Sequence, residues 1–316
     1  MSLDRAVLIT GAAGFIGGYT ADSFSKAGWR VIGADRINCG SSTHPAEPRF
    51  DHYIQEDLAK ESIITALLNQ HRPQVCIHLA GPASVEGSFQ EPLTDFSAQT
   101  LPLLHLLEAV RRSRITTRIL LVSSAAVYGN PESLPVTEEA RIQPISPYGF
   151  HKYYQEMLLD QYRALYGFSV CKARVFSTYG PGLTHLAVWD ITRRALRGDY
   201  TTFGNGGETR DYLCVNDVAA ALCCIGERAA FSGEAINVAS GRETRIIELA
   251  EKIYLELGIN ATARLLKRQE STGIPARWCA DVSRLGLLGF TPRTSLEEGI
   301  SQTVRWIGAE CTASDL

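Results

Sequence analysis

The sequence lacks the cysteine and histidine spacings used by metal sites and disulfide frameworks. Its eight cysteines, at positions 39, 76, 171, 214, 223, 224, 279 and 311, form no Cys-x-x-Cys pair, and its seven histidines form no His-x-x-x-His pair. Several of the cysteines fall within apolar runs. We therefore predict reduced thiols buried in the core and no bound metal.

Long hydrophobic runs and an excess of one charge are also missing. No apolar run approaches the 18 residues of a membrane span, and the first residues resemble no signal peptide. The formal net charge of -3 gives no general attraction to nucleic acid or to anionic membranes. We expect a cytoplasmic protein whose partners include neither nucleic acid nor membrane.

A glycine-rich turn follows the first short apolar run. Gly11, Gly14 and Gly17 stand between a predicted strand and a predicted helix, and Asp35 ends the next strand. In such a βαβ unit the glycines allow a tight turn and close approach to a pyrophosphate, while the acid accepts hydrogen bonds from a ribose. Asp35 would repel a 2′-phosphate, which favours NAD over NADP, although the adjoining Arg36 weakens that preference.

A tyrosine and a lysine stand four residues apart at the start of a later predicted helix. At this spacing Tyr148 and Lys152 project from one helix face. A nearby ammonium favours the phenolate and lowers the pKa of a tyrosine, so that it can take a proton from an alcohol. By itself the pair is weak evidence, because one such spacing arises easily by chance.

Predicted strands alternate with predicted helices along most of the chain. The fold class that we predict is α/β, a doubly wound parallel sheet of the Rossmann type with a smaller, mixed C-terminal substrate lobe. We assign residues 1–175 to an NAD-binding domain, to which residues 212–240 return. Residues 176–211 and 241–316 would form the substrate-binding lobe.

Six motifs occur in a fixed order along nearly the whole chain. They are Thr10-Gly-Ala-Ala-Gly-Phe-Ile-Gly17, Asp57-Leu58, His78-Leu-Ala-Gly81, Ser123-Ser-Ala-Ala-Val-Tyr-Gly129, Tyr148-x-x-x-Lys152 and Arg210-Asp-Tyr212. Together they resemble the extended short-chain dehydrogenase/reductase family, in its NAD-dependent epimerase/dehydratase branch that acts on nucleotide sugars.

The resemblance implies catalytic roles for Ser124, Tyr148 and Lys152. Tyr148 would exchange a proton with the sugar hydroxyl, Lys152 would hold the nicotinamide ribose and lower the tyrosine pKa, and Ser124 would bind the same substrate oxygen. Arg210 would grip the sugar diphosphate with its guanidinium. Asp57 would bind the adenine amino group.

The same resemblance places further residues at the two ligands. Those expected at NAD are Gly11, Gly14, Phe15, Ile16, Gly17, Asp35, Arg36, Asp57, Leu58, Leu79, Ala80, Gly81, Gln99, Ser123, Tyr148 and Lys152. Those expected at the nucleotide-sugar substrate, with a UDP-sugar favoured, are Ser84, Ser124, Ser177, Val188, Phe203, Arg210 and Arg277.

The chain also departs from the family pattern. Ser177 and Gln99 stand where asparagine is common, and the second diphosphate arginine is replaced by the tract from Glu270 to Thr272. Arg268 or Arg277 would have to take the place of that arginine, and the sequence does not decide between them.

The two residues after Ser124 bear on the reaction. Dehydratases of the family carry Asp-Glu there, 3,5-epimerases a cysteine and decarboxylases a glutamate at the second position, whereas this chain has Ala125 and Ala126. A methyl group moves no proton. We predict a 4-epimerase of the UDP-glucose/galactose type. A reductase of 4-keto sugars that uses NAD(P)H remains an alternative, and a non-catalytic nucleotide-binding relative is less favoured.

The resemblance also implies a homodimer with a four-helix interface.

Overall fold

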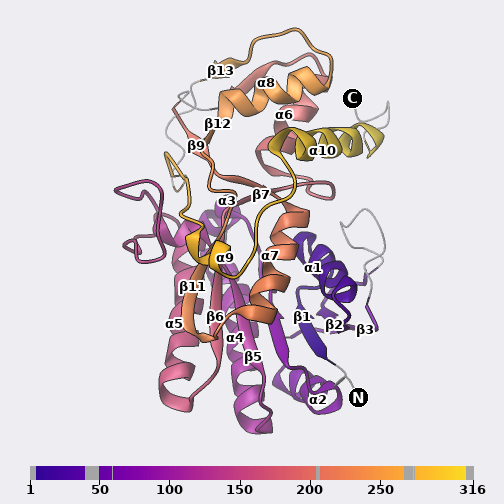
Figure 1. Ribbon diagram of the computed structural model, residues 1–316, viewed down its shortest axis with the longest axis vertical. Coiled ribbons are helices and arrows are strands. Elements are labelled where there is room, and N and C mark those ends of the chain that lie inside the picture. The colour runs from indigo at the N-terminus through magenta and orange to yellow at the C-terminus, as the bar shows by residue number, and fades with distance from the viewer. Residues whose placement is uncertain are drawn as a thin grey trace.

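A seven-stranded parallel sheet forms the centre of the protein in a computed structural model (Figure 1). The model describes residues 5–39, 50–58, 60–203, 207–266, 273 and 275–310. The strand order is β11-β6-β5-β4-β1-β2-β3. Because the order reverses between β1 and β4, the carboxyl ends of these strands open a crevice of the kind that binds ligands in doubly wound sheets.

The strands of this sheet are short and follow the predicted apolar runs. They are β1 (Ala6–Thr10), β2 (Arg30–Asp35), β3 (His52–Gln55), β4 (Val75–His78), β5 (Arg118–Ser124), β6 (Val170–Val175) and β11 (Ser232–Val238). All neighbouring pairs in it are parallel.

Helices cover both faces of the sheet. Alternate residues of β1 face opposite sides of the sheet. Val7 and Ile9 belong to one buried cluster, together with residues of α1 (Phe15–Lys26) and α7 (Val215–Arg228), and Leu8 belongs to a second cluster. That second cluster includes residues of α2 (Glu61–His71), α4 (Pro92–Ser113) and α5 (Pro147–Tyr166). Strands buried on both faces explain why the sequence shows continuous apolar runs rather than alternation.

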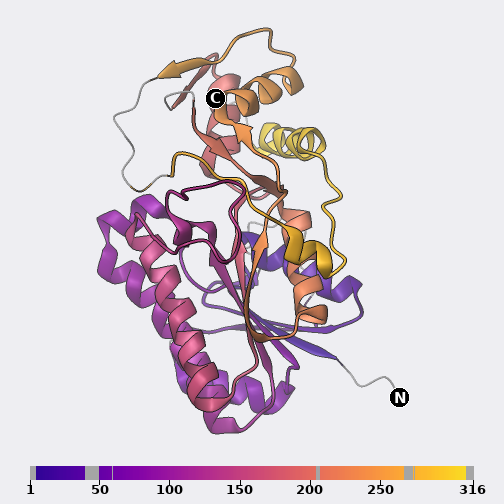
Figure 2. The same cartoon turned by 60° about the vertical axis from the view of Figure 1, so that its left-hand side comes forward.

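A second, smaller group of elements lies beyond the carboxyl ends of the strands (Figures 1 and 2). Side chains of three helices and of the β7–β10 ribbon form its own hydrophobic cluster. The elements of this region are β7 (Ser177–Tyr179), α6 (Leu186–Leu196), β8 (Thr201–Phe203), β9 (Thr209–Arg210), β10 (Tyr212–Cys214), β12 (Thr244–Arg245), α8 (Ile246–Glu256), β13 (Arg264–Leu266) and α10 (Leu296–Glu310).

The predicted fold class is confirmed, and the exact domain limits stay a prediction. Several short elements were not predicted: β3, α3 (Val85–Gln90), the 3-10 helix η2 (Ala125–Tyr128), β7, β10 and α9 (Ser283–Leu287) among them. In the described part of the chain no helix is long and apolar enough to cross a membrane. The seven cysteines in that part are free, and four of them are buried.

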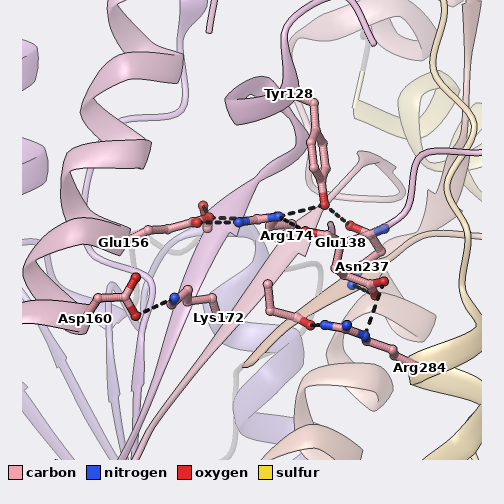
Figure 3. A network of polar contacts seen from close by, with 10 residues as sticks. Tyr128, Glu138, Glu156, Asp160, Lys172, Arg174, Asn237 and Arg284 are labelled. Carbon is pink, nitrogen blue, oxygen red and sulfur yellow. Dashed lines mark hydrogen bonds and ion pairs between the residues drawn. The ribbon is translucent and has the colours of Figure 1, made fainter. Parts of the chain in front are cut away.

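A buried polar network ties α5 to the sheet (Figure 3). Arg174 of β6 forms two hydrogen bonds with the Glu156 carboxylate of α5, at 2.7 and 3.0 Å, and both residues are buried. Ser123 of β5 donates to the same carboxylate at 2.6 Å. On the other side, Arg174 donates to the Tyr128 hydroxyl, which donates to the Asn237 side chain of β11. One network therefore joins three strands to the helix that carries Tyr148 and Lys152.

We predict that Glu156→Gln lowers the free energy of unfolding by about 3 kcal/mol, because it leaves the buried Arg174 guanidinium uncompensated. The control is Glu297→Gln on α10. Glu297 pairs with Lys252 of α8, and the two side chains are 65% and 36% exposed, so we expect a loss below about 1 kcal/mol. Denaturant unfolding of both variants measures the difference, and equal losses would contradict the role assigned to Glu156.

Candidate active site

The glycine-rich turn packs backbone against backbone at the end of β4. Gly11 has φ +71°, and a Cβ there would lie 2.7 Å from the Ala80 nitrogen. A Cβ on Gly17 would strike the Gly11 carbonyl oxygen. Only glycine fits both positions, so the N-terminus of α1 and the end of β4 stand close together, as a pyrophosphate cradle requires.

Asp35 lies beside this turn at the end of β2. One carboxylate oxygen accepts a hydrogen bond from the Ala13 N–H at 3.1 Å and the other accepts from the Ile37 N–H at 3.3 Å. A carboxylate oxygen has further acceptor capacity, which suits ribose hydroxyls. Arg36, directly after it, is exposed.

Gln99 supplies a buried acceptor at the edge of the crevice. Its amide nitrogen donates to the Pro82 carbonyl at 2.8 Å, while its Oε1 is buried and has no hydrogen-bond partner among the described residues. A Cβ on Gly81 would lie 2.8 Å from this oxygen. An unpartnered buried oxygen beside Gly81 fits a ligand that offers a donor, as expected for the cofactor.

The remaining predicted cofactor residues surround this region in different ways. Phe15 and Ile16 begin α1 and are half-buried, Asp57 is exposed, and Leu58 is buried in the core. The hydroxyl of Ser123 points to Glu156. Their contacts with NAD stay a prediction.

Helix α5 begins where its sequence dictates. Ser146 is the N-cap and accepts from the Gly149 N–H at 3.1 Å, and Pro147 takes the first helical position. The Tyr148 N–H donates to the Ser88 hydroxyl of α3 at 3.0 Å. The first turn, with Tyr148 one turn from Lys152, is thereby held beside Ser124 at the end of β5.

Burial controls the phenol of Tyr148. The pKa of Tyr148 is raised to about 12, mainly by desolvation; a hydrogen bond with Ser124 opposes this shift, and the charge of Asp95 adds to it. The lowering of this pKa by Lys152 stays a prediction, and in the protein alone the net shift is upward. The Lys152 ammonium lies 5.9 Å from the centre of the phenol ring and donates to the Val122 carbonyl at 3.3 Å.

The pKa of Lys152 is shifted in the opposite direction, downward. Desolvation lowers the pKa of its ammonium to about 8, and the charges of Asp95 and Glu156 oppose that effect. The site therefore combines a phenol that keeps its proton with an ammonium that titrates near neutral pH.

Ala125 and Ala126 form the first turn of η2 directly beside these groups. Both are buried, and the Ser124 hydroxyl accepts from the Ala126 N–H at 3.2 Å. Neither alanine has a side chain that could exchange a proton. Nor do the described residues contain a cluster of three or more histidine, cysteine or acidic side chains suited to a metal ion.

The residues predicted at the substrate lie on several elements. Ser84 is the N-cap of α3, Ser177 begins β7, and Val188 is buried in the core of the smaller group. The side chain of Phe203 lies outside the described residues, as do Arg268 and the tract from Glu270 to Thr272.

The two candidate diphosphate arginines differ. Arg210 of β9 is half-buried, donates to the carbonyls of Thr209 and Ala276, and stacks 5.4 Å from the Trp278 ring centre. Arg277 is exposed and forms a two-point ion pair with Glu243, at 2.7 and 2.8 Å. Arg210 is therefore the more firmly oriented of the two, and a substrate would have to compete with Glu243 for Arg277.

Two features of this region escaped prediction. Asp211 is buried and accepts hydrogen bonds from Ser240, Gly241 and Ala280, so that it joins β9 to two other segments. Asp95 of α4 contacts His151 of α5, beside the predicted catalytic pair. No local sequence pattern marks contacts between residues this far apart.

Comparison with known proteins agrees with this geometry. The family model described as GDP-mannose 4,6 dehydratase matches residues 8–303. The UDP-glucose 4-epimerase of Mycolicibacterium smegmatis is 32% identical over 315 residues, which cover 95% of this chain and 97% of that protein.

Solved structures give the same result. The UDP-glucose 4-epimerase of Thermotoga maritima, determined with UDP-glucose, has a TM-score of 0.87 at 29% identity and covers 97% of this chain and 99% of its own. The UDP-glucose 4-epimerase of Thermus thermophilus in complex with NAD has a TM-score of 0.85 at 27% identity, with 97% and 100% covered. The chain belongs to the NAD-dependent epimerase/dehydratase family, the extended short-chain dehydrogenases/reductases that act on nucleotide sugars.

Proposed function

We propose that the protein is a 4-epimerase of UDP-sugars. The observation that carries the proposal is the pair Ala125–Ala126, buried beside Ser124 and Tyr148 where further proton chemistry would need a titratable side chain. A site of this composition is suited to moving a hydride and one hydroxyl proton. Epimerisation at C4 through a transient 4-keto sugar requires no other proton transfer.

In this proposal each residue of the site has a separate role in proton transfer or in cofactor binding. Tyr148 takes the C4 hydroxyl proton and later returns it, and the Ser124 hydroxyl orients the same oxygen. The glycine-rich turn, Asp35 and Lys152 would hold NAD, which supplies a hydride acceptor and donor and, in its oxidised form, a positive ring that favours the Tyr148 phenolate. Burial of the phenol makes this charge effective, because little water screens it.

The choice of substrate is supported by the relatives and by Arg210. The relatives compared above are UDP-glucose 4-epimerases, and one was solved with UDP-glucose. Arg210, held against Trp278, presents a guanidinium suited to a diphosphate. We expect the protein to act in the cytoplasm.

A reductase of nucleotide-linked 4-keto sugars is the second candidate. It would use the same three catalytic residues, and the exposed Arg36 next to Asp35 would tolerate NADP better than Asp35 alone. The two functions differ in whether the cofactor is regenerated within each cycle.

We predict that the protein interconverts UDP-glucose and UDP-galactose, or their N-acetyl or uronic acid forms, without added cofactor. Product formation is followed by anion-exchange chromatography. Tyr148→Phe, which removes one oxygen from the same ring, is expected to lose at least about 100-fold in kcat because the proton acceptor is gone. Oxidation of NAD(P)H in proportion to a 4-keto substrate would favour the reductase. Failure of every sugar in both assays would leave nucleotide binding as the function.

We also propose a homodimer formed through α4 and α5, which pack side by side on one outer face of the molecule (Figure 2). Large apolar side chains are exposed along both helices at helical spacing. They are Leu93, Phe96 and Leu101 on α4, and Phe150, Tyr154 and Met157 on α5. A second copy that covers this stripe would bury it in a four-helix interface.

Met157→Glu should therefore give a monomer, because it places a charge in the proposed interface, where the side chain is 50% exposed in one subunit. Leu255→Glu on α8, at a side chain 80% exposed in the other lobe, is the matched control and should remain dimeric. Light scattering after size-exclusion chromatography measures the mass. A monomeric native protein, or a dimeric Met157→Glu variant, would refute this interface.

A further inference from the structure

A buried tryptophan contacts both the candidate diphosphate arginine and the end of η2. Trp278 is 9% exposed, and its indole N–H donates a hydrogen bond at 3.1 Å to the carbonyl oxygen of Gly129, the residue that follows η2. The guanidinium of Arg210 lies over the same ring, 5.4 Å from its centre, which is within the range of a cation–π interaction. One side chain therefore touches two parts of the candidate site that are distant in sequence.

Three further contacts fix the orientation of this indole. The ring of Phe176 packs edge-on against it, with ring centres 5.8 Å apart. The Trp278 backbone N–H donates to the Thr209 carbonyl at 3.2 Å, and the Thr209 N–H donates to the Ala276 carbonyl at 3.1 Å. The segment that carries Trp278 thus lies beside β9, and the residue of β9 that follows Thr209 is Arg210.

The indole also belongs to the hydrophobic cluster of the catalytic residues. Trp278 shares this cluster with Ala125, Ala126 and Tyr148. A guanidinium held against the indole is consequently held at a set place relative to Tyr148. The proposed substrate has to reach both groups at once, with its diphosphate at Arg210 and its sugar at Tyr148.

Arg210 uses only part of its guanidinium within the protein. Its Nη1 donates to the carbonyl oxygens of Thr209 and Ala276, at 2.6 and 3.4 Å. Among the described residues, Nε and Nη2 have no hydrogen-bond partner and no carboxylate forms an ion pair with this side chain. A planar guanidinium with donors left over is suited to phosphate oxygens. Because Arg210 is half-buried, its contact with an aromatic face is stronger than at the surface.

We propose that Trp278 is a positioning residue that holds the guanidinium of Arg210 in the orientation that binds the diphosphate of the substrate. The proposal deepens the function proposed above and rests on its assignment of the diphosphate to Arg210. Trp278 acts through Arg210, so its contribution to binding should disappear when the guanidinium is removed. A residue that only stabilised the fold would contribute equally with and without Arg210.

The test measures the binding of UDP, which carries the diphosphate but no sugar, by isothermal titration calorimetry of the protein saturated with NAD. Trp278→Leu removes the aromatic face and should weaken UDP binding about 10-fold, whereas Trp278→Phe keeps a face and should lose no more than about 3-fold. In a protein that already carries Arg210→Gln, adding Trp278→Leu should cause no further loss.

Trp29→Leu is the matched control. Trp29 is also buried, its indole N–H donates to Glu227 at 2.9 Å, Arg5 lies over its ring at 4.7 Å, and Phe24 packs edge-on against it at 5.5 Å. It directly precedes β2, at the end of the sheet opposite to the crevice. Its replacement should therefore leave UDP affinity unchanged. Trp278→Met, with a longer apolar side chain, serves in place of Trp278→Leu if that variant does not fold.

Equal losses in Trp278→Phe and Trp278→Leu would overturn the proposal, as would a loss from Trp278→Leu that persists without the Arg210 guanidinium. A native protein that fails to bind UDP at millimolar concentration would overturn it too. The expected pattern of UDP binding in a protein that epimerises none of the sugars would uphold this inference and reject the proposed function. Epimerisation together with native UDP affinity in Trp278→Leu would reject this inference and leave the proposed function intact.

Discussion

The ion pair between Glu156 and Arg174 is the contact on which the geometry of the site depends. It joins α5 to β6, and through Ser123 it reaches the end of β5, where Ser124 stands. Glu156 lies one helical turn beyond Lys152, as Lys152 lies one turn beyond Tyr148. A helix anchored at this point presents Tyr148 and Lys152 to the crevice at a fixed depth, and the network through Tyr128 and Asn237 keeps three strands in place around it.

Desolvation then determines how the anchored residues behave. The same burial that raises the pKa of Tyr148 lowers that of Lys152, because it disfavours whichever form is charged. In a site that excludes water, an isolated charge is poorly stabilised. A charge placed close to another charge there has a strong effect on it. In the proposed function, the oxidised cofactor would act on Tyr148 through this property, which groups at the protein surface could not use.

The βαβ unit and the fold class could be predicted because they depend on local patterns: the apolar runs of β1 and β2, the glycines between them, and Asp35 after β2. Tyr148 and Lys152 could be predicted from their spacing and from the order of the other motifs. The pKa of Tyr148 could not, since it depends on burial by segments distant in sequence. Asp95 and His151, 56 positions apart, meet only because α4 and α5 pack together. Short strands such as β7 and β10 are likewise stabilised by their tertiary pairing rather than by a run of their own.

The central claim is that this site moves a hydride and one hydroxyl proton and no proton from carbon. Its most direct test is to let the enzyme act on a UDP-sugar in heavy water for many turnovers and to examine the sugar by proton NMR and mass spectrometry. We expect full interconversion at C4 with no deuterium on any carbon, because Ala125 and Ala126 provide no group to exchange it. Deuterium at C5 would contradict the claim, since it would reveal a second acid–base residue in the site.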